Sequence, residues 1–87
     1  MSDSLRIDKW LCHARFCKTR GIAQQKAAQG RIRLNGHRVE KPSVGIRVGD
    51  VVTLPHLGKV ISLKVLGLGV RRGPAAEAQT LYELIED

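Results

Sequence analysis

The sequence predicts an α+β domain in which two short N-terminal helices pack on a small antiparallel sheet and a further helix follows near the C-terminus. Three observations support this fold class. Apolar residues recur at helical spacing near the N-terminus, the apolar period changes to two after Gly30, and Asn35-Gly36 is a strong hairpin signal. The chain has 87 residues, which fits one domain with a core of modest size.

Two helices are expected in the first thirty residues. The first should run from about residue 8 to about residue 16, because its apolar residues share one helical face: Ile7, Trp10, Leu11 and Ala14. The second should follow Thr19 as its N-cap, continue through the good helix formers of 23–28, and end before Gly30 as a left-handed cap. Trp10 lies on the apolar face and is therefore expected in the core.

Strands are expected in the middle of the chain. Ile32 and Leu34 alternate with two arginines, and a returning strand should follow the Asn35-Gly36 turn. Gly49-Asp50 predicts another turn, followed by apolar strands over 51–54 and 60–66. A glycine-rich loop then leads to Pro74, which is expected at the first position of a helix over about 75–85.

Charge is concentrated in the first half of the chain. The formal net charge is +7, and residues 1–50 carry eleven Lys or Arg against four Asp or Glu, whereas residues 51–87 carry four of each. A small domain with this excess of positive charge attracts polyanions.

No apolar run is long enough to span a bilayer and no secretion signal is visible, so a cytoplasmic location is expected. The two cysteines are too close together for a disulfide framework.

Five motifs occur in an order and spacing that resemble the S4 RNA-binding domain family. They are RIDKWL at 6–11, KTR at 18–20, GRIRLNG at 30–36, KPS at 41–43 and VGD at 48–50. In addition, RRGPAAEAQTLYE at 71–83 is similar to a segment of the group formed by the bacterial fifteen-kilodalton heat-shock protein and ribosome-quality-control factor P. The resemblance implies an S4-type (alpha-L) RNA-binding fold over 1–70, with its core motifs at 5–54, and a C-terminal loop and helix extension over 71–87.

The same resemblance implies a function. The protein is expected to dock on ribosomal RNA of the large subunit, to recognise subunits stranded with peptidyl-tRNA, and so to act in ribosome rescue and quality control linked to heat shock. It is expected to be a monomer, without a membrane or small-molecule partner. No catalytic constellation is visible, and Cys12, His13 and Cys17 lack the spacing of a zinc site, so no enzymatic activity, cofactor or metal is expected.

Candidate RNA-binding residues follow from their positions. Arg6, Lys9 and His13 are spaced to lie together on a helical face away from the apolar stripe. Thr19 and Arg20 stand at a helix start, which favours anions. Arg31 and Arg33 should project from one face of the sheet. The full expected set is Arg6, Lys9, His13, Arg15, Lys18, Thr19, Arg20, Gln24, Arg31, Arg33, Asn35 and Lys41.

Several alternatives stay open from the residues alone. Asn35 and Gly36 are explained by turn chemistry without any RNA contact, and Arg71 and Arg72 are compatible with RNA, a ribosomal protein or water. One Trp, one Tyr and one Phe are too few for base-stacking platforms, so RNA shape and phosphates are the expected target. Two rival functions are an accessory module of an RNA-modifying enzyme and a DNA-binding helix-turn-helix protein.

Overall fold

The structure, a computed structural model, describes residues 3–85. Its elements in chain order are β1 (Leu5–Arg6), α1 (Ile7–His13), α2 (Arg20–Ala28), β2 (Arg33–Leu34), β3 (His37–Arg38), β4 (Gly45–Ile46), β5 (Val51–His56), β6 (Lys59–Val65), α3 (Ala75–Ala78), a 3₁₀ turn (Gln79–Leu81) and β7 (Tyr82–Ile85). The predicted α+β fold class is confirmed. None of the helices among these residues is long and apolar enough to cross a membrane.

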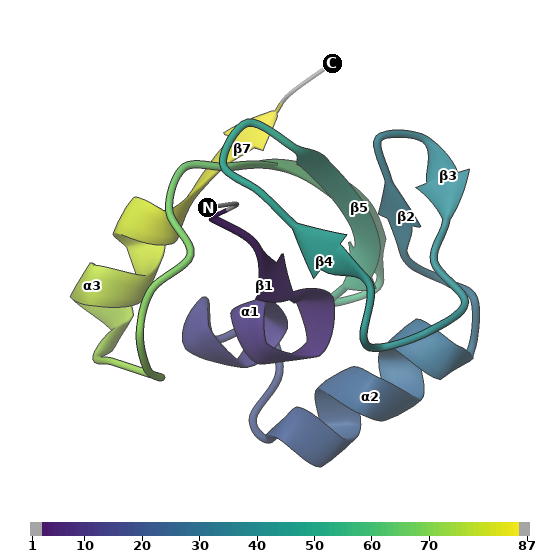
Figure 1. Cartoon of the computed structure of the whole chain (residues 1–87), viewed down its shortest axis with the longest axis horizontal. Helices are drawn as coiled ribbons and strands as arrows, with labels where there is room; N and C mark the ends of the chain where they lie inside the picture. The colour runs from purple at the N-terminus through teal and green to yellow at the C-terminus, as the bar shows by residue number, and fades with distance from the viewer. Residues whose placement is uncertain (1–2, 86–87) are drawn as a thin grey trace.

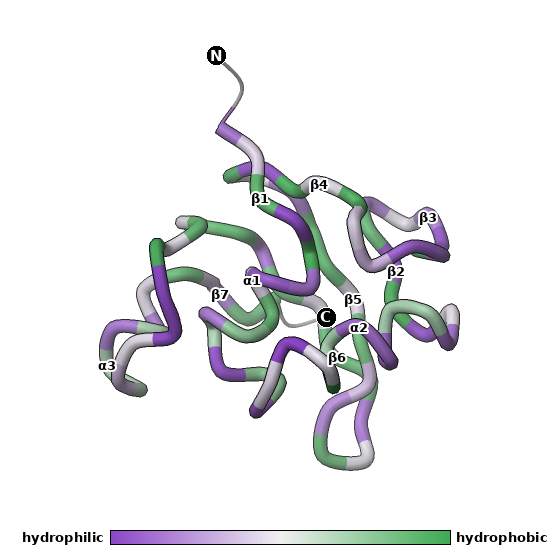
Figure 2. Tube along the Cα trace, turned by 60° about the horizontal axis from the view of Figure 1, so that its bottom comes forward, coloured by the Kyte–Doolittle hydropathy of each residue, from purple (hydrophilic) through white to green (hydrophobic). Residues whose placement is uncertain are grey.

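The main sheet has five antiparallel strands in the order β3-β2-β5-β6-β7, and β1 pairs separately with β4. The sheet curves around α1, with α3 near one end and α2 and the β2–β3 hairpin near the other (Figure 1). The β3 strand is hydrophilic and stands at the edge of the molecule (Figure 2). The β1–β4 pairing places Leu5 opposite Ile46 and Arg6 opposite Gly45, which fixes Arg6 at the start of α1.

The core lies between α1 and the concave side of the sheet. The predicted apolar stripe of α1 is buried, including Trp10, which confirms its expected place in the core. Val52, Leu54 and Leu63 of β5 and β6 belong to the same cluster. The indole Nε1–H of Trp10 donates a hydrogen bond to the carbonyl of Gly67 at 2.9 Å, so burial of this large side chain leaves no polar atom unpaired.

Local signals for the second helix and the hairpin are confirmed. The Thr19 hydroxyl accepts a hydrogen bond from the backbone N–H of Ile22 at 3.2 Å, as an N-cap does. Gly30 has φ of 72° beyond the end of α2, in the left-handed region. Asn35 and Gly36 have φ of 51° and 83°, which are the positive values that a two-residue turn between β2 and β3 requires.

The first helix ends earlier than residue 16. The N–H groups of Phe16 and Arg15 bond to the carbonyls of Leu11 and Cys12, and Arg15 has φ of 65°. This is a Schellman ending with arginine instead of glycine in the left-handed position. Phe16 then leaves the helix and packs on Tyr82, with 4.7 Å between ring centroids. Aromatic packing of Phe16 therefore competes with continuation of the helix.

The C-terminal helix is present but much shorter than the expected 75–85. Pro74 is the N-cap rather than the first helical residue, and α3 covers only Ala75–Ala78. Residues 82–85 form β7, which pairs with β6 from Ser62↔Ile85 to Val65↔Tyr82. Pairing with the free edge of β6 satisfies backbone groups that a helix would have satisfied internally. The division at residue 70 stays a prediction, although β7 belongs to the main sheet.

Candidate nucleic-acid interface

A buried carboxylate organises the start of α1. The side chain of Asp8 has no exposed surface, and both of its oxygens accept hydrogen bonds. Arg6 donates from Nε to Oδ1 at 3.2 Å and from one terminal nitrogen to Oδ2 at 3.0 Å. Gln24 donates to Oδ2 at 3.2 Å and Arg20 donates from Nε to the same oxygen at 3.4 Å. We call these four residues the Asp8 cluster.

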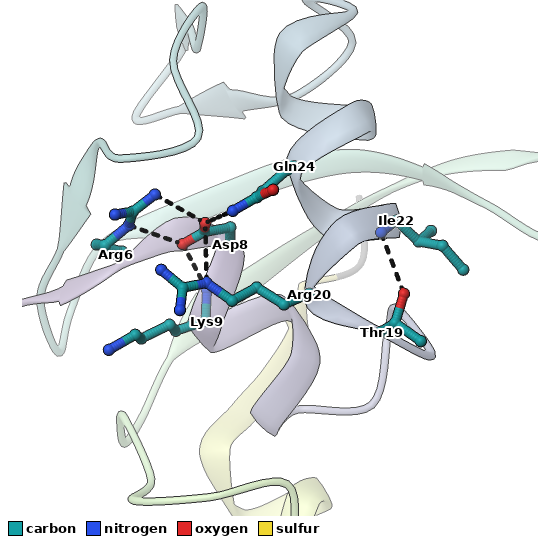
Figure 3. Close-up of polar contacts among 7 residues, drawn as sticks. All are labelled: Arg6, Asp8, Lys9, Thr19, Arg20, Ile22 and Gln24. Atoms are coloured by element: carbon teal, nitrogen blue, oxygen red, sulfur yellow. Dashed lines mark hydrogen bonds and ion pairs between the residues drawn. The ribbon is translucent and has the colours of Figure 1, made fainter.

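The cluster joins three elements of the fold. Arg6 comes from β1, Asp8 from α1, and Arg20 and Gln24 from α2, and their side chains converge on the carboxylate while the side chain of Lys9 extends away from it (Figure 3). The backbone N–H of Lys9 adds a hydrogen bond to Oδ1 at 2.8 Å. A single aspartate thus sets the positions of two arginines that lie 14 residues apart in the sequence.

The environment keeps Asp8 ionised. Burial by itself would raise the pKa of this carboxyl group. The hydrogen bonds from Arg6, Gln24 and the Lys9 N–H, together with the charge of Arg6, outweigh burial and hold the pKa of Asp8 below its ordinary 3.8. At neutral pH the cluster therefore contains one carboxylate and two guanidinium groups, with a net charge of about +1.

The two arginines of the cluster face solvent although their partner does not. The side chains of Arg6 and Arg20 are 41% and 45% exposed. Arg20 reaches Asp8 through Nε alone, so its terminal amino groups are available to an outside partner. A guanidinium group that a buried carboxylate holds in place and that also faces solvent is suited to bind phosphate oxygens, which it can do in a forked geometry.

Beside the cluster lies a cleft of about 440 Å³. It is bordered by β1, the outer side of α1, the start of α2 and the loop before α3. We call it the basic cleft, and its lining residues are Leu5, Lys9, Cys12, His13, Arg20, Gly69, Val70 and Arg72. The structure thus brings Lys9 and His13 together, as their spacing predicts. The prediction that Arg6 shares their helical face was wrong, because Arg6 lies in β1 and precedes the helix.

The remaining candidates lie on α2, the β2–β3 hairpin and the following loop. Lys18 and Thr19 are exposed at the start of α2, and Arg31 and Arg33 are exposed on either side of buried Ile32. Only Arg33 belongs to β2, where it lies opposite Arg38 of β3. Lys41 is exposed in the loop that leads to β4. The expected alternation of arginines with buried residues is therefore present.

Two predicted site residues have clear contacts inside the fold. Arg15 donates from a terminal nitrogen to the carbonyl of Gly73 at 2.8 Å. The side-chain oxygen of Asn35 accepts from the N–H of Val51 at 2.8 Å, and its amide nitrogen donates to Asp50 at 3.2 Å. Both side chains hold loops in place, which explains these residue types without an RNA contact.

Sequence reasoning missed the role of Asp8 and the place of Arg72. One signal was available for Asp8, because residues 1–50 contain only four acids and this one stands between Arg6 and Lys9. Arg72 had no comparable signal, since only the folded loop brings it to the cleft that Lys9 also lines. Neither cysteine forms a disulfide, and burial raises the pKa of the Cys17 thiol, partly offset by the charge of Lys26. Within residues 3–85, no group of three or more His, Cys, Asp or Glu side chains could hold a metal ion.

Comparison with known proteins identifies the class. The sequence profile of the S4 domain matches residues 5–52, more than half of the chain, and the chain belongs to the S4 domain family. The matched segment contains all of the Asp8 cluster and both N-terminal helices. The predicted family is thereby confirmed.

Individual relatives point to a particular group within this family. Heat shock protein 15 of Escherichia coli K12 is 38% identical over 79 residues, which are 91% of this chain but 59% of that protein. The chain thus spans about three fifths of that relative's length. An RQC P-site tRNA stabilizing factor of Streptococcus pneumoniae R6 is 32% identical, with 95% of this chain and 92% of that protein covered. The trimeric structure of Vibrio cholerae heat shock protein 15 is 35% identical, has a TM-score of 0.89, and is matched over 95% of this chain and 83% of that one.

Proposed function

We propose that this protein binds RNA through the Asp8 cluster and the basic surface around it. The observation that carries the proposal is the pairing of one fully buried carboxylate with two arginines that remain about half exposed. Holding long cationic side chains in place lowers the entropy lost when they bind phosphates. The concentration of positive charge in residues 1–50 supports the same reading.

The RNA is proposed to be ribosomal RNA of the large subunit, in subunits stranded with peptidyl-tRNA. The name of one relative, an RQC P-site tRNA stabilizing factor, supports a target that contains P-site tRNA. The name of the other relative, heat shock protein 15, supports the link to heat shock. The protein would act in the cytoplasm by binding alone, with no reaction of its own. It would steady the obstructed complex while other factors release or extend the nascent chain.

Recognition is proposed to rest on phosphates and RNA shape rather than on stacked bases. Arg6, Arg20 and Gln24 would form the centre of the interface, with Lys9 and His13 beside them. Arg15 and Asn35 keep the fold contacts described above. The remaining predicted residues would extend the interface along α2, the β2–β3 hairpin and the loop before β4, and they are Lys18, Thr19, Arg31, Arg33 and Lys41.

The proposed working form is a monomer, because residues of a single chain form both the Asp8 cluster and the basic cleft. The Vibrio cholerae relative has been described as a trimer, so the oligomeric state needs its own measurement. Sedimentation velocity across a range of protein concentrations is suitable. A single species of about 9.6 kDa supports the monomer, and a concentration-independent species three times heavier excludes it.

Binding to purified ribosomal subunits tests the proposed target. Labelled protein is titrated with large subunits, small subunits and a duplex DNA of equal phosphate concentration at one salt concentration, because salt sets the strength of every phosphate contact. The expected order of affinity is large subunit, then small subunit, then DNA. Preference for duplex DNA would favour a helix-turn-helix protein instead. Equal affinity for all three would leave only non-specific attraction to polyanions.

A further inference from the structure

The loop between β6 and α3 is bonded at one end to the first helix and at the other end to Arg15, which follows that helix. Trp10 donates to the carbonyl of Gly67 at 2.9 Å, and Nδ1 of His13 lies 3.2 Å from the carbonyl of Leu68. A carbonyl only accepts, so this nitrogen carries the proton. Arg15 donates to the carbonyl of Gly73 at 2.8 Å. Residues 69–72 therefore lie beside α1 between two hydrogen-bonded ends of the loop.

The backbone conformation of the loop and its packing on Leu81 favour glycine at position 69. Gly69 has φ of 73°, in the left-handed region. A Cβ atom at this position would lie 3.1 Å from Cδ1 of Leu81 and 3.5 Å from Cβ of His13. A side chain there would press on Leu81 and would be strained at this φ, so the position of residues 69–72 depends on this glycine.

The two arginines of the loop have different surroundings. Arg71 pairs with Glu77 at the start of α3, with 3.4 Å between the guanidinium nitrogen and the carboxylate oxygen. Arg72 instead lines the basic cleft together with Lys9 and Arg20. Val70 lies in the same lining, and 89% of its surface is exposed, so it offers an apolar contact to a bound group.

We propose that the basic cleft receives one nucleotide of the bound RNA, held out of its helix. The phosphate would lie among Lys9, Arg20 and Arg72, and the nucleoside would lie against Leu5, Cys12 and Val70. This inference rests on the proposed RNA-binding function. It adds the loop at 69–72 to the proposed RNA interface, although this loop lies outside the segment that the S4 profile matches.

Size and lining support a nucleotide rather than an isolated phosphate. The cleft of about 440 Å³ falls within the roughly 300–1,000 Å³ typical of small-ligand sites. An anion alone would need only the three cations and would leave the apolar wall unused. Folded RNAs present unpaired nucleotides at bulges and loops, where proteins contact them at lower cost than in a helix.

Neighbouring arginines provide a matched test on RNA. Affinity for large-subunit RNA is measured for the wild type and for Arg72→Ala, Arg71→Ala and Arg20→Ala at several salt concentrations. We expect Arg72→Ala to weaken binding about fivefold or more and to flatten the salt slope by about 0.7–0.9. Arg71→Ala should stay within about twofold of the wild type. Gly69→Ala should weaken binding without removing any charge.

The pattern of losses separates the two proposals. If Arg20→Ala loses affinity while Arg72→Ala behaves like Arg71→Ala, the cleft is not used and the RNA-binding function stands. If the wild type does not bind large-subunit RNA, both proposals fail. If Arg71→Ala and Arg72→Ala lose affinity equally, the loop acts only through its general charge, which also excludes the cleft.

A second experiment tests the nucleoside part of the site. The amide resonances of the labelled wild type and of Val70→Ser are followed by NMR during titration with adenosine 5′-monophosphate, inorganic phosphate and adenosine at constant ionic strength. We expect the mononucleotide to shift the amides of Lys9, Cys12, His13 and residues 69–72 more strongly than phosphate does. Val70→Ser should reduce that difference. Added large-subunit RNA should displace the mononucleotide.

Three results would overturn the nucleotide assignment. Equal shifts and affinities for phosphate and mononucleotide would define an anion site only. Absence of shifts at the cleft would exclude the site. A mononucleotide that RNA fails to displace would identify a free nucleotide, rather than a residue of the RNA chain, as the ligand.

Discussion

Arg20 of α2 reaches Asp8 of α1 through a contact of 3.4 Å between Nε and Oδ2, and it does so with nearly half of its own side chain exposed. The contact joins the packing of two helices to the orientation of a surface cation. Because the carboxylate is fully buried, its ionised form depends on these donors. Changes to Asp8 should therefore affect both stability and RNA binding.

Replacing Asp8 with Asn tests this link. The amide keeps one acceptor but turns an N–H group toward the donors Arg6 and Arg20, so we expect the free energy of unfolding to fall by about 2 kcal/mol. RNA affinity of the folded variant should also fall, because both arginines lose their anchor. Urea denaturation and RNA titration measure the two effects. Asp3→Asn, at an exposed position, is the control and should change neither.

The pH dependence of stability follows from the lowered pKa of Asp8 in the folded protein. A carboxyl group whose pKa is lower in the folded state than in the unfolded state, where it is about 3.9, stabilises the fold above that value. The stabilisation is lost as pH falls through the lower, folded pKa. The difference in unfolding free energy between wild type and Asp8→Asn should therefore shrink below about pH 4. A constant difference down to about pH 2.5 would argue against an ionised Asp8 in the cluster.

Arg20→Ala should remove about one phosphate contact. Each contact releases counterions, so the slope of log affinity against log salt should become shallower by about 0.7–0.9. The variant should still fold, because Arg6 and Gln24 continue to bond Asp8. Arg47→Ala removes an equal charge from an exposed turn outside the cluster and is the matched control. An unchanged slope for Arg20→Ala would remove this residue from the interface.

Asn35→Ala should lower stability rather than RNA affinity. The side chain of Asn35 bonds to Val51 and Asp50, and its φ of 51° is unfavourable for alanine. We expect a loss of about 1–2 kcal/mol in unfolding free energy, and RNA affinity within about twofold of wild type once the protein is folded. Asn35→Gly tolerates the positive φ and should lose less stability. A large loss of affinity in a stable Asn35→Gly variant would assign this side chain to RNA.

Sequence patterns predicted correctly those elements that depend only on residues close together in the chain. The helical spacing from Ile7 to Ala14, the Thr19 cap and the Asn35-Gly36 turn each depend on neighbouring residues, and each is present in the structure. The 75–85 segment has a helical composition, but Tyr82–Ile85 gains more from the free edge of β6. Such a choice depends on a strand that is distant in the sequence, so composition alone could not reveal it.

The sequence allowed a positively charged surface to be predicted, but not the contacts among its side chains. Arg20 and Gln24 both belong to the set of expected RNA-binding residues, and both reach the same oxygen of Asp8. Their common partner lies 12 and 16 residues earlier, where an aspartate beside two cations looks like an ordinary surface pair. Burial of that aspartate is a tertiary property, as is the place of Arg72 in the cleft that Lys9 also lines.

Co-sedimentation through a sucrose gradient of cell lysate tests the central claim most directly. Tagged wild type and Arg20→Ala are compared with and without puromycin, which releases nascent chains. We predict that the wild type is enriched on free large subunits, that puromycin removes this enrichment, and that a smaller fraction of Arg20→Ala than of the wild type sediments with these subunits. Absence of the wild-type protein from every ribosomal fraction would contradict the account.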